Sequence, residues 1–121
     1  MADAEPTRVH FENSQPILRV ENMEASLRFY VGQLDFKNAD WGSGDFTYVS
    51  RDDAGIYLCQ GGQGRGGAWV WMGVDDVRKL QDELTARGVA VRHPPTNYSW
   101  ALEMHVEDPD GNVIRFGSEP E

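Results

Sequence analysis

The sequence predicts an α+β fold in which two βαβββ modules form a curved mixed sheet with a cleft, and the helices lie outside. A glycine-rich stretch, 61–67, lies near the middle of the chain and contains five glycines in seven residues. The order of predicted elements is the same on both sides of this stretch. Val20-Glu21-Asn22-Met23 also aligns with Val74-Asp75-Asp76-Val77, where a helix follows a strand in each half. Halves of this size rarely bury a core alone, so we expect them to pack together.

In the first half, we expect a strand over 15–20 and a helix over 23–34. Pro16 stands near the start of the strand, where a missing backbone donor is tolerated. Asn22 is a typical helix N-cap, because its side chain can accept a bond from a free backbone N–H group. Three strands are expected next, over 36–41, 46–51 and 56–60, with turns of glycine and aspartate between them. Upstream, Val9-His10-Phe11 is a candidate short edge strand.

In the second half, we expect a strand over 68–74 and a helix over 77–87. Asp75 or Asp76 caps this helix, and Gly88 ends it. The remaining strands are predicted over 89–92, 100–107 and 112–117, with His93-Pro94-Pro95 in a loop. The predicted divisions of the chain are an N-terminal arm over 1–13, a first module over 14–60, a connector over 61–67, a second module over 68–118 and a tail over 119–121.

The charge balance excludes some classes of partner. Twenty acidic and eleven basic residues give a net charge of −9. Nucleic acid is therefore not an expected partner, because polyanions require a basic surface. The sequence has no long apolar run and only one cysteine, Cys59, so we expect a cytoplasmic protein that does not enter a membrane. Negative potential of this kind attracts positively charged ligands.

The chain contains four tryptophans, and two of them, Trp69 and Trp71, are two residues apart. In a strand, both project to the same face. Such an aromatic wall is suited to a planar ligand. Ordinary packing of large aromatic side chains in a core or an interface remains the alternative.

Several motifs resemble the vicinal-oxygen-chelate superfamily, which includes glyoxalase I, extradiol dioxygenases, fosfomycin-resistance enzymes and bleomycin-resistance proteins. The resemblance covers about residues 14–118. It depends on the repeated element order and on the following motifs: Ile17-Leu18-Arg19-Val20, Ser26-Leu27-Arg28-Phe29-Tyr30, Leu34-Asp35-Phe36 and Asp108-Pro109-Asp110-Gly111-Asn112. The last motif is the most specific. The family usually has glycine at the position of Asp35.

Enzymes of this superfamily hold one metal ion with side chains from both modules. The resemblance places those positions at Gln15, Tyr57, Trp69 and Arg115. Divalent metal sites need imidazole, thiolate or carboxylate groups that converge, and this set does not provide them. We therefore expect no resident metal, no other cofactor and no catalytic residue, and any metal is expected to arrive with the ligand.

Within the superfamily, the sequence most resembles the bleomycin-resistance proteins, which bind the antibiotic without metal chemistry. The resemblance implies a homodimer that exchanges its N-terminal strand, with Pro16 at the hinge and clefts at the interface. The protein would then sequester a cationic, planar-ringed antibiotic of the bleomycin type. The residues expected to bind this ligand are Asp40, Trp41, Asp45, Phe46, Asp52, Tyr57, Cys59, Trp69, Trp71, Trp100, Glu103 and Arg115.

Two alternatives remain open at this stage. One is a metal-dependent enzyme of the same superfamily, such as a glyoxalase-like isomerase or lyase, or a dioxygenase. The other is a binder of a different aromatic small molecule, since a fold does not determine its ligand.

Overall fold

The structure is a computed structural model that describes residues 8–121. The first half contains β1 (Ile17–Arg19), α1 (Met23–Leu27), η2 (Arg28–Gln33), β2 (Lys37–Asn38), β3 (Phe46–Arg51) and β4 (Ala54–Cys59). The second half contains β5 (Trp69–Gly73), α2 (Val77–Ala86), β6 (Val91–Asn97), β7 (Leu102–Glu107) and β8 (Val113–Ser118). η2 is a wider helical turn that continues directly from α1.

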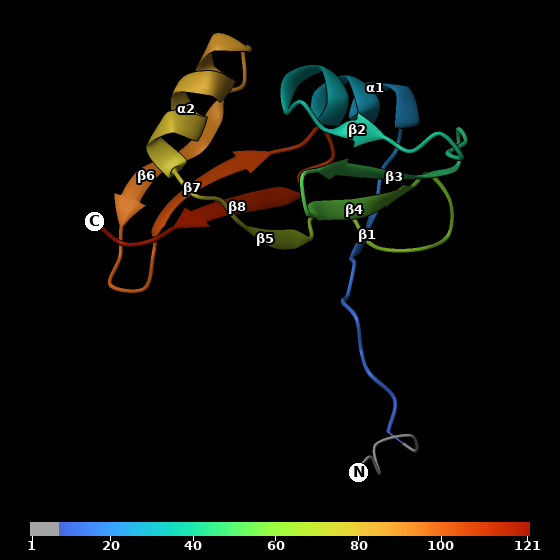
Figure 1. Ribbon diagram of the computed structural model, residues 1–121. Coiled ribbons are helices and arrows are strands. Elements are labelled where there is room, and N and C mark those ends of the chain that lie inside the picture. Colours follow the sequence, from blue (N-terminus) through green and yellow to red (C-terminus); the bar gives the residue numbers. More distant parts are fainter. Residues whose placement is uncertain (1–7) are drawn as a thin grey trace.

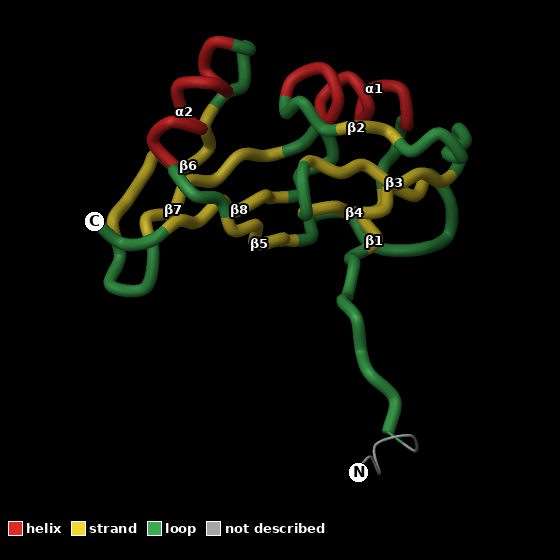
Figure 2. Tube along the Cα trace, in the orientation of Figure 1, coloured by secondary structure: helices red, strands yellow, loops and turns green. Residues whose placement is uncertain are grey.

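The strands form two four-stranded sheets with the same arrangement. Their orders are β1-β4-β3-β2 and β5-β8-β7-β6. In each sheet the first and fourth strands of the module pair in parallel, and the other neighbours are antiparallel. Both helices lie on the same side of the sheets (Figures 1 and 2). The predicted α+β class with two βαβββ modules is therefore confirmed.

The predicted helix caps are present. The Asn22 side chain accepts a hydrogen bond from the backbone N–H of Ala25, and the Asp76 side chain accepts one from Lys79. Gly88 follows the second helix with φ of 82°, which glycine adopts without steric cost. Asp35 follows the first helix with φ of 63°, a left-handed conformation. That conformation explains why glycine is usual in the family at this position.

Three sequence predictions of strands were inaccurate. Val9-His10-Phe11 forms no strand, and the extended arm that holds it projects away from the body of the protein (Figure 1). The strand expected over 36–41 is reduced to the two residues of β2. β6 includes His93-Pro94-Pro95, which we expected to be a loop. It lies at the edge of its sheet, where proline does not interrupt a ladder on both sides.

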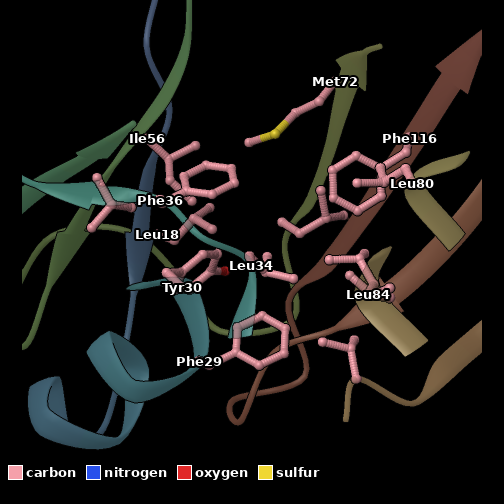
Figure 3. Packing of buried hydrophobic residues seen from close by; sticks show 14 of the residues in the cluster. Leu18, Phe29, Tyr30, Leu34, Phe36, Ile56, Met72, Leu80, Leu84 and Phe116 are labelled. Atoms are coloured by element: carbon pink, nitrogen blue, oxygen red, sulfur yellow. The ribbon is translucent and has the colours of Figure 1, made fainter. Parts of the chain in front are cut away.

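One hydrophobic core joins the two modules. Phe36 and Ile56 from the first module approach Met72 and Phe116 from the second, and Leu34 lies between them (Figure 3). All five side chains are buried. Each module alone would expose its half of this cluster to water, which is why the chain requires both.

The Asp108–Asn112 turn holds the modules together by hydrogen bonds. The buried Asp108 carboxylate accepts bonds from the Tyr30 hydroxyl at 2.8 Å and from the backbone and side-chain nitrogens of Asn112, both at 2.9 Å. Burial, with the negative Asp108 beside the phenol, raises the pKa of Tyr30 well above its usual range. The Asp110 side chain accepts a further bond from the backbone N–H of Glu21. The motif that is most specific to the family is thus an inter-module joint.

Within residues 8–121, no helix has both the length and the apolar character needed to cross a lipid bilayer.

Candidate functional site

The two faces of each sheet have different roles, because alternate residues of a strand point to opposite sides. On β5 and β8, Met72 and Phe116 face the core, while Trp71 and Arg115 face the other way. The helices cover the core side of both sheets (Figure 1). The outward faces are the ones that carry the exposed aromatic residues predicted from the sequence.

A groove of about 780 Å³ lies between the modules on the opposite, core-facing side. Its walls include the apolar side chains of Leu34, Phe36, Met72 and Phe116. Beside this groove, a bidentate ion pair joins the modules, because Arg51 donates to both Glu83 carboxylate oxygens at 2.7 and 2.9 Å. Among the predicted ligand residues, all of which the structure describes, only Asp52 lines this groove. The groove is therefore distinct from the aromatic faces.

On the first sheet, aromatic rings pack directly on one another. The Phe46 ring stacks on Tyr57 with centroids 5.3 Å apart, and Tyr48 lies 4.8 Å from Tyr57. Trp41, in the loop before β3, is 6.3 Å from Phe46 and 6.4 Å from Tyr57. The cross-strand register explains the cluster, because Tyr48 and Tyr57 are paired partners on β3 and β4. We call Trp41, Phe46, Tyr48 and Tyr57 the first aromatic group.

On the second sheet, two tryptophans are held by a buried carboxylate. Trp71 and Trp100 each donate the indole N–H to Oε2 of Glu103, at 3.1 and 3.2 Å. The Arg115 guanidinium donates from Nε and Nη2 to Oε1 of the same carboxylate. Tyr98 stacks on one face of the Trp100 ring, with the ring centroids 4.6 Å apart and the planes nearly parallel, at 7°. We call Trp71, Trp100, Glu103 and Arg115 the Glu103 cluster.

Trp69 lies beside this cluster with other partners. The rings of Trp69 and His105 pack edge to face. The Arg92 guanidinium lies 5.2 Å from the centre of the Trp69 ring, in cation–π contact. His105 also contacts the ring of His93 on β6. Within residues 8–121, no ring pair joins these residues to the first aromatic group.

The electrostatics of the second sheet are dominated by Glu103, which is 1% exposed. Burial by itself raises the pKa of this carboxyl, but hydrogen bonds from Arg115, Trp71 and Trp100 outweigh burial and leave the pKa below its usual value. Burial, with the nearby His93 and Arg115, lowers the pKa of His105. At neutral pH the Glu103 cluster therefore holds an ionised carboxylate paired with a guanidinium, and the neighbouring His105 imidazole is neutral.

The predicted acidic ligand residues occupy different places. Asp40 and Asp45 are exposed and flank Trp41 in the loop between β2 and β3. Asp52 follows the far end of β3, so the strand length separates it from Phe46 by about 20 Å. Glu103 is buried and already paired with Arg115. Cys59 is buried at the end of β4, opposite Phe46.

The four positions at which family enzymes hold a metal do not fit one in this chain. Trp69 has no lone pair to offer, Arg115 is a cation bound to Glu103, and Tyr57 is packed among aromatic rings. The Gln15 amide donates to Asn13. In the part of the chain that the structure describes, no three His, Cys, Asp or Glu side chains converge as a metal site would require.

Sequence reasoning missed several residues of these faces. Tyr48 belongs to the first aromatic group, and Tyr98, Arg92 and His93 contact residues of the second sheet. Period-two alternation from Phe46 would have identified Tyr48. Arg92 and His93 depend on the course of β6, which we expected to end at residue 92.

Fold and site together define a paired-module protein with open aromatic sheet faces. The sequence profile described as the Glyoxalase/Bleomycin resistance protein/Dioxygenase superfamily matches residues 8–116. The chain therefore belongs to this superfamily, as the resemblance implied.

Solved structures with the same fold include three from Streptomyces. TnmS3, an antibiotic-binding protein from Streptomyces sp. CB03234, is 28% identical with a TM-score of 0.79, covering 94% of this chain and 100% of its own. A glyoxalase/bleomycin resistance protein from the same strain is 29% identical with a TM-score of 0.71, covering 87% and 100%. The bleomycin-binding protein of bleomycin-producing Streptomyces verticillus, solved with copper(II)-bleomycin, is 26% identical with a TM-score of 0.76, covering 93% and 99%. No curated protein matches the sequence.

Proposed function

We propose that this protein binds a cationic, planar-ringed antibiotic of the bleomycin type and sequesters it without chemical change. The observation that carries the proposal is the exposure of all four tryptophans, which lies between 54% and 64%. Large aromatic side chains gathered on an open face are typical of a ligand or partner surface. The similarity to antibiotic-binding proteins supports the same interpretation.

The chemistry of the two faces suits such a ligand. A ring stacked on an indole gains about 1 kcal/mol beyond the area that it buries. The exposed Asp40 and Asp45 beside Trp41 provide negative charge for a cationic tail, which the net charge of −9 reinforces. The residues at the family's metal positions do not fit a resident ion, so a metal would enter only as part of the ligand.

We further propose that the binding unit is a homodimer in the cytoplasm. The first aromatic group and the Glu103 cluster belong to different modules, and no ring pair within residues 8–121 joins them. A second copy would bring the first aromatic group of one subunit against the second sheet of the other. The arm supports this arrangement, because Val9 and Phe11 are 77% and 89% exposed on the segment that precedes β1 and leaves the body of the protein (Figure 1). Light scattering of the purified protein tests the dimer, and a monomer at micromolar concentration would contradict it.

Calorimetric titration with bleomycin, with and without copper(II), tests the binding function. We expect one ligand per chain, and Trp100→Ala should weaken binding at least about tenfold, because an exposed stacking surface is removed. Asp45→Asn should weaken binding of the cationic ligand, whereas Asp82→Asn, an exposed acid on α2, should not. An absence of heat and of fluorescence change in the wild type would contradict the proposal. Metal-dependent turnover of a hemithioacetal would instead support an isomerase of the same superfamily.

A further inference from the structure

Glu103 combines a buried position with contacts to the exposed surface. It lies in the middle of the second sheet on β7, and its side chain is 2% exposed. Yet two of its hydrogen-bond donors, Trp71 and Trp100, are among the most exposed large side chains of the protein. Oε2 accepts both indole N–H groups, while Oε1 accepts the two Arg115 donors. One carboxylate thus fixes two ring edges from beneath.

Each ring is also held on one face. An added Cβ at Gly117 would lie 2.6 Å from the Trp71 ring, so this ring rests directly on the backbone of β8. Trp100 is covered on one face by Tyr98. With its N–H edge bound to Glu103 and one face covered, each ring is restrained on two sides yet remains more than half exposed. Rings restrained in this way lose less conformational entropy when a planar ligand stacks on them.

The same contacts leave the Glu103 carboxylate unavailable to bind a cationic group of a ligand. Its carboxylate is buried and faces the Arg115 guanidinium, so the pair presents little net charge to a ligand. Cation recognition would then fall to exposed acids such as Asp40 and Asp45 near the first aromatic group.

We infer that Glu103 is a positioning residue, which sets the planes of Trp71 and Trp100 before a ligand arrives and makes no ion pair with the ligand itself. This inference rests on the proposed function in one respect, namely that a planar ligand stacks on this face. The restraint of the two rings can be tested without any ligand.

The first test is NMR of the ligand-free protein with ¹⁵N-labelled tryptophan, in which Trp71→Phe and Trp100→Phe assign the indole signals. Glu103→Gln should shift the Trp71 and Trp100 indole N–H resonances and speed their exchange with water, whereas the Trp41 resonance, in the loop before β3, should not change. Glu107→Gln is the matched control, because Glu107 lies on the same strand but is exposed and paired with Arg92. A folded Glu103→Gln variant with both resonances unmoved would overturn the inference.

The second test is calorimetry with bleomycin on the same variants. Glu103→Gln should weaken binding at least about fivefold, through a loss of pre-organisation, and Glu107→Gln should leave it unchanged. If Glu103→Gln does not fold, Trp71→Phe replaces it, since phenylalanine keeps a ring but removes the N–H donor, and it should weaken binding similarly. Shifted indole signals with unchanged affinity would overturn the positioning role while leaving the binding function intact. A wild-type protein that does not bind bleomycin would contradict the proposed function, and the NMR result would still decide whether Glu103 restrains the rings.

Discussion

The two sheets share one strand order, yet different forces hold their outward faces. On the first sheet, the rings of Phe46 and Tyr48 both contact Tyr57, and Trp41 packs against Phe46 and Tyr57. On the second sheet, Trp71 and Trp100 are each hydrogen-bonded to the buried Glu103. Ring contacts tolerate a range of offset-stacked and edge-to-face geometries, whereas hydrogen bonds to a carboxylate restrict both distance and angle more closely. Repetition of a module thus repeats the backbone but leaves the outward positions free to diverge.

The module joints show the same asymmetry. The turn between β7 and β8 carries the buried Asp108, which binds Tyr30 and Asn112. The corresponding turn between β3 and β4 carries Asp52 and Asp53, which are exposed. The Asp108 turn therefore holds the neighbouring module through buried groups, whereas the β3–β4 hairpin contributes the partly exposed Arg51, which pairs with Glu83.

The largest effect is expected from Asp108→Ala. This change leaves the buried Tyr30 hydroxyl and the Asn112 amide without their acceptor, so we expect a loss of about 3 kcal/mol in the free energy of unfolding. Asp53→Ala, in the equivalent turn of the first module, should change it by less than about 0.5 kcal/mol. Urea unfolding monitored by tryptophan fluorescence measures both, and equal effects would contradict the asymmetry.

The second largest effect is expected from Glu103→Gln, which should lower the free energy of unfolding by about 2 kcal/mol at pH 7. An amide accepts the Arg115 donors more weakly than a carboxylate does and adds a donor of its own. The pKa of Glu103 is lowered in the folded protein, so its contribution is complete above the unfolded value of about 4.3 and disappears as the pH falls through the folded pKa. The difference between variant and wild type should therefore shrink below about pH 4. Unfolding at pH 7 to 3 tests this, with Glu107→Gln expected within about 0.5 kcal/mol of wild type.

A smaller effect is expected when alanine replaces the glycine beneath an aromatic ring in each sheet. At Gly117 an added Cβ would displace the Trp71 ring and disturb its bond to Glu103, at a cost of about 1 kcal/mol. At Gly55 the added Cβ would meet the hydroxyl oxygen and two ring carbons of Tyr48, at 2.1 to 2.9 Å. These atoms lie at the far end of the Tyr48 side chain, so we expect this ring to tilt away at a lower cost. Chemical denaturation compares the two variants, and near-ultraviolet circular dichroism should change more for Gly117→Ala. The opposite ranking would show that ring contacts restrain the first sheet more tightly than we infer.

The smallest effect concerns His105. Its pKa is lowered in the folded protein by burial and by His93 and Arg115, so the unfolded chain takes up a proton first. Stability should decline as the pH falls from about 6.5 toward the folded pKa, a range above that of Glu103. His105→Gln should remove this decline, as measured by thermal unfolding between pH 8 and 5. An unchanged pH profile in that variant would assign the decline to another group.

Sequence reasoning predicted what local chemistry determines. Asn22, and either Asp75 or Asp76, were predicted as caps because a side-chain acceptor before a helix has one dominant use, and the structure assigns the second cap to Asp76. The module order followed from the repeated pattern of strands and helices. β6 was predicted too short because proline is normally a strand breaker, and whether a strand is at an edge is decided by the tertiary fold.

The candidate site was predicted only in part, because its contacts are made between side chains on different strands. The sequence identified Trp71, Trp100 and Arg115 separately, and Glu103 as a candidate partner for a cationic ligand. Their convergence on one carboxylate depends on the register that places Glu103 opposite Gly117, and His105 opposite Arg115. A charge count cannot show that Glu103 on β7 is already paired with Arg115 on the neighbouring strand β8.

The Gly61–Gly67 connector contributes little to the union of the halves compared with the core, the Asp108 turn and the Arg51–Glu83 pair. Arg87 adds to that union by donating to the carbonyl oxygens of Gln33 and Gly32 at the end of η2. A trypsin nick after the exposed Arg65 should consequently yield two fragments that travel together on a sizing column. The halves would then behave as complementing pieces, and a split version of the protein would offer a reporter of its own reassembly.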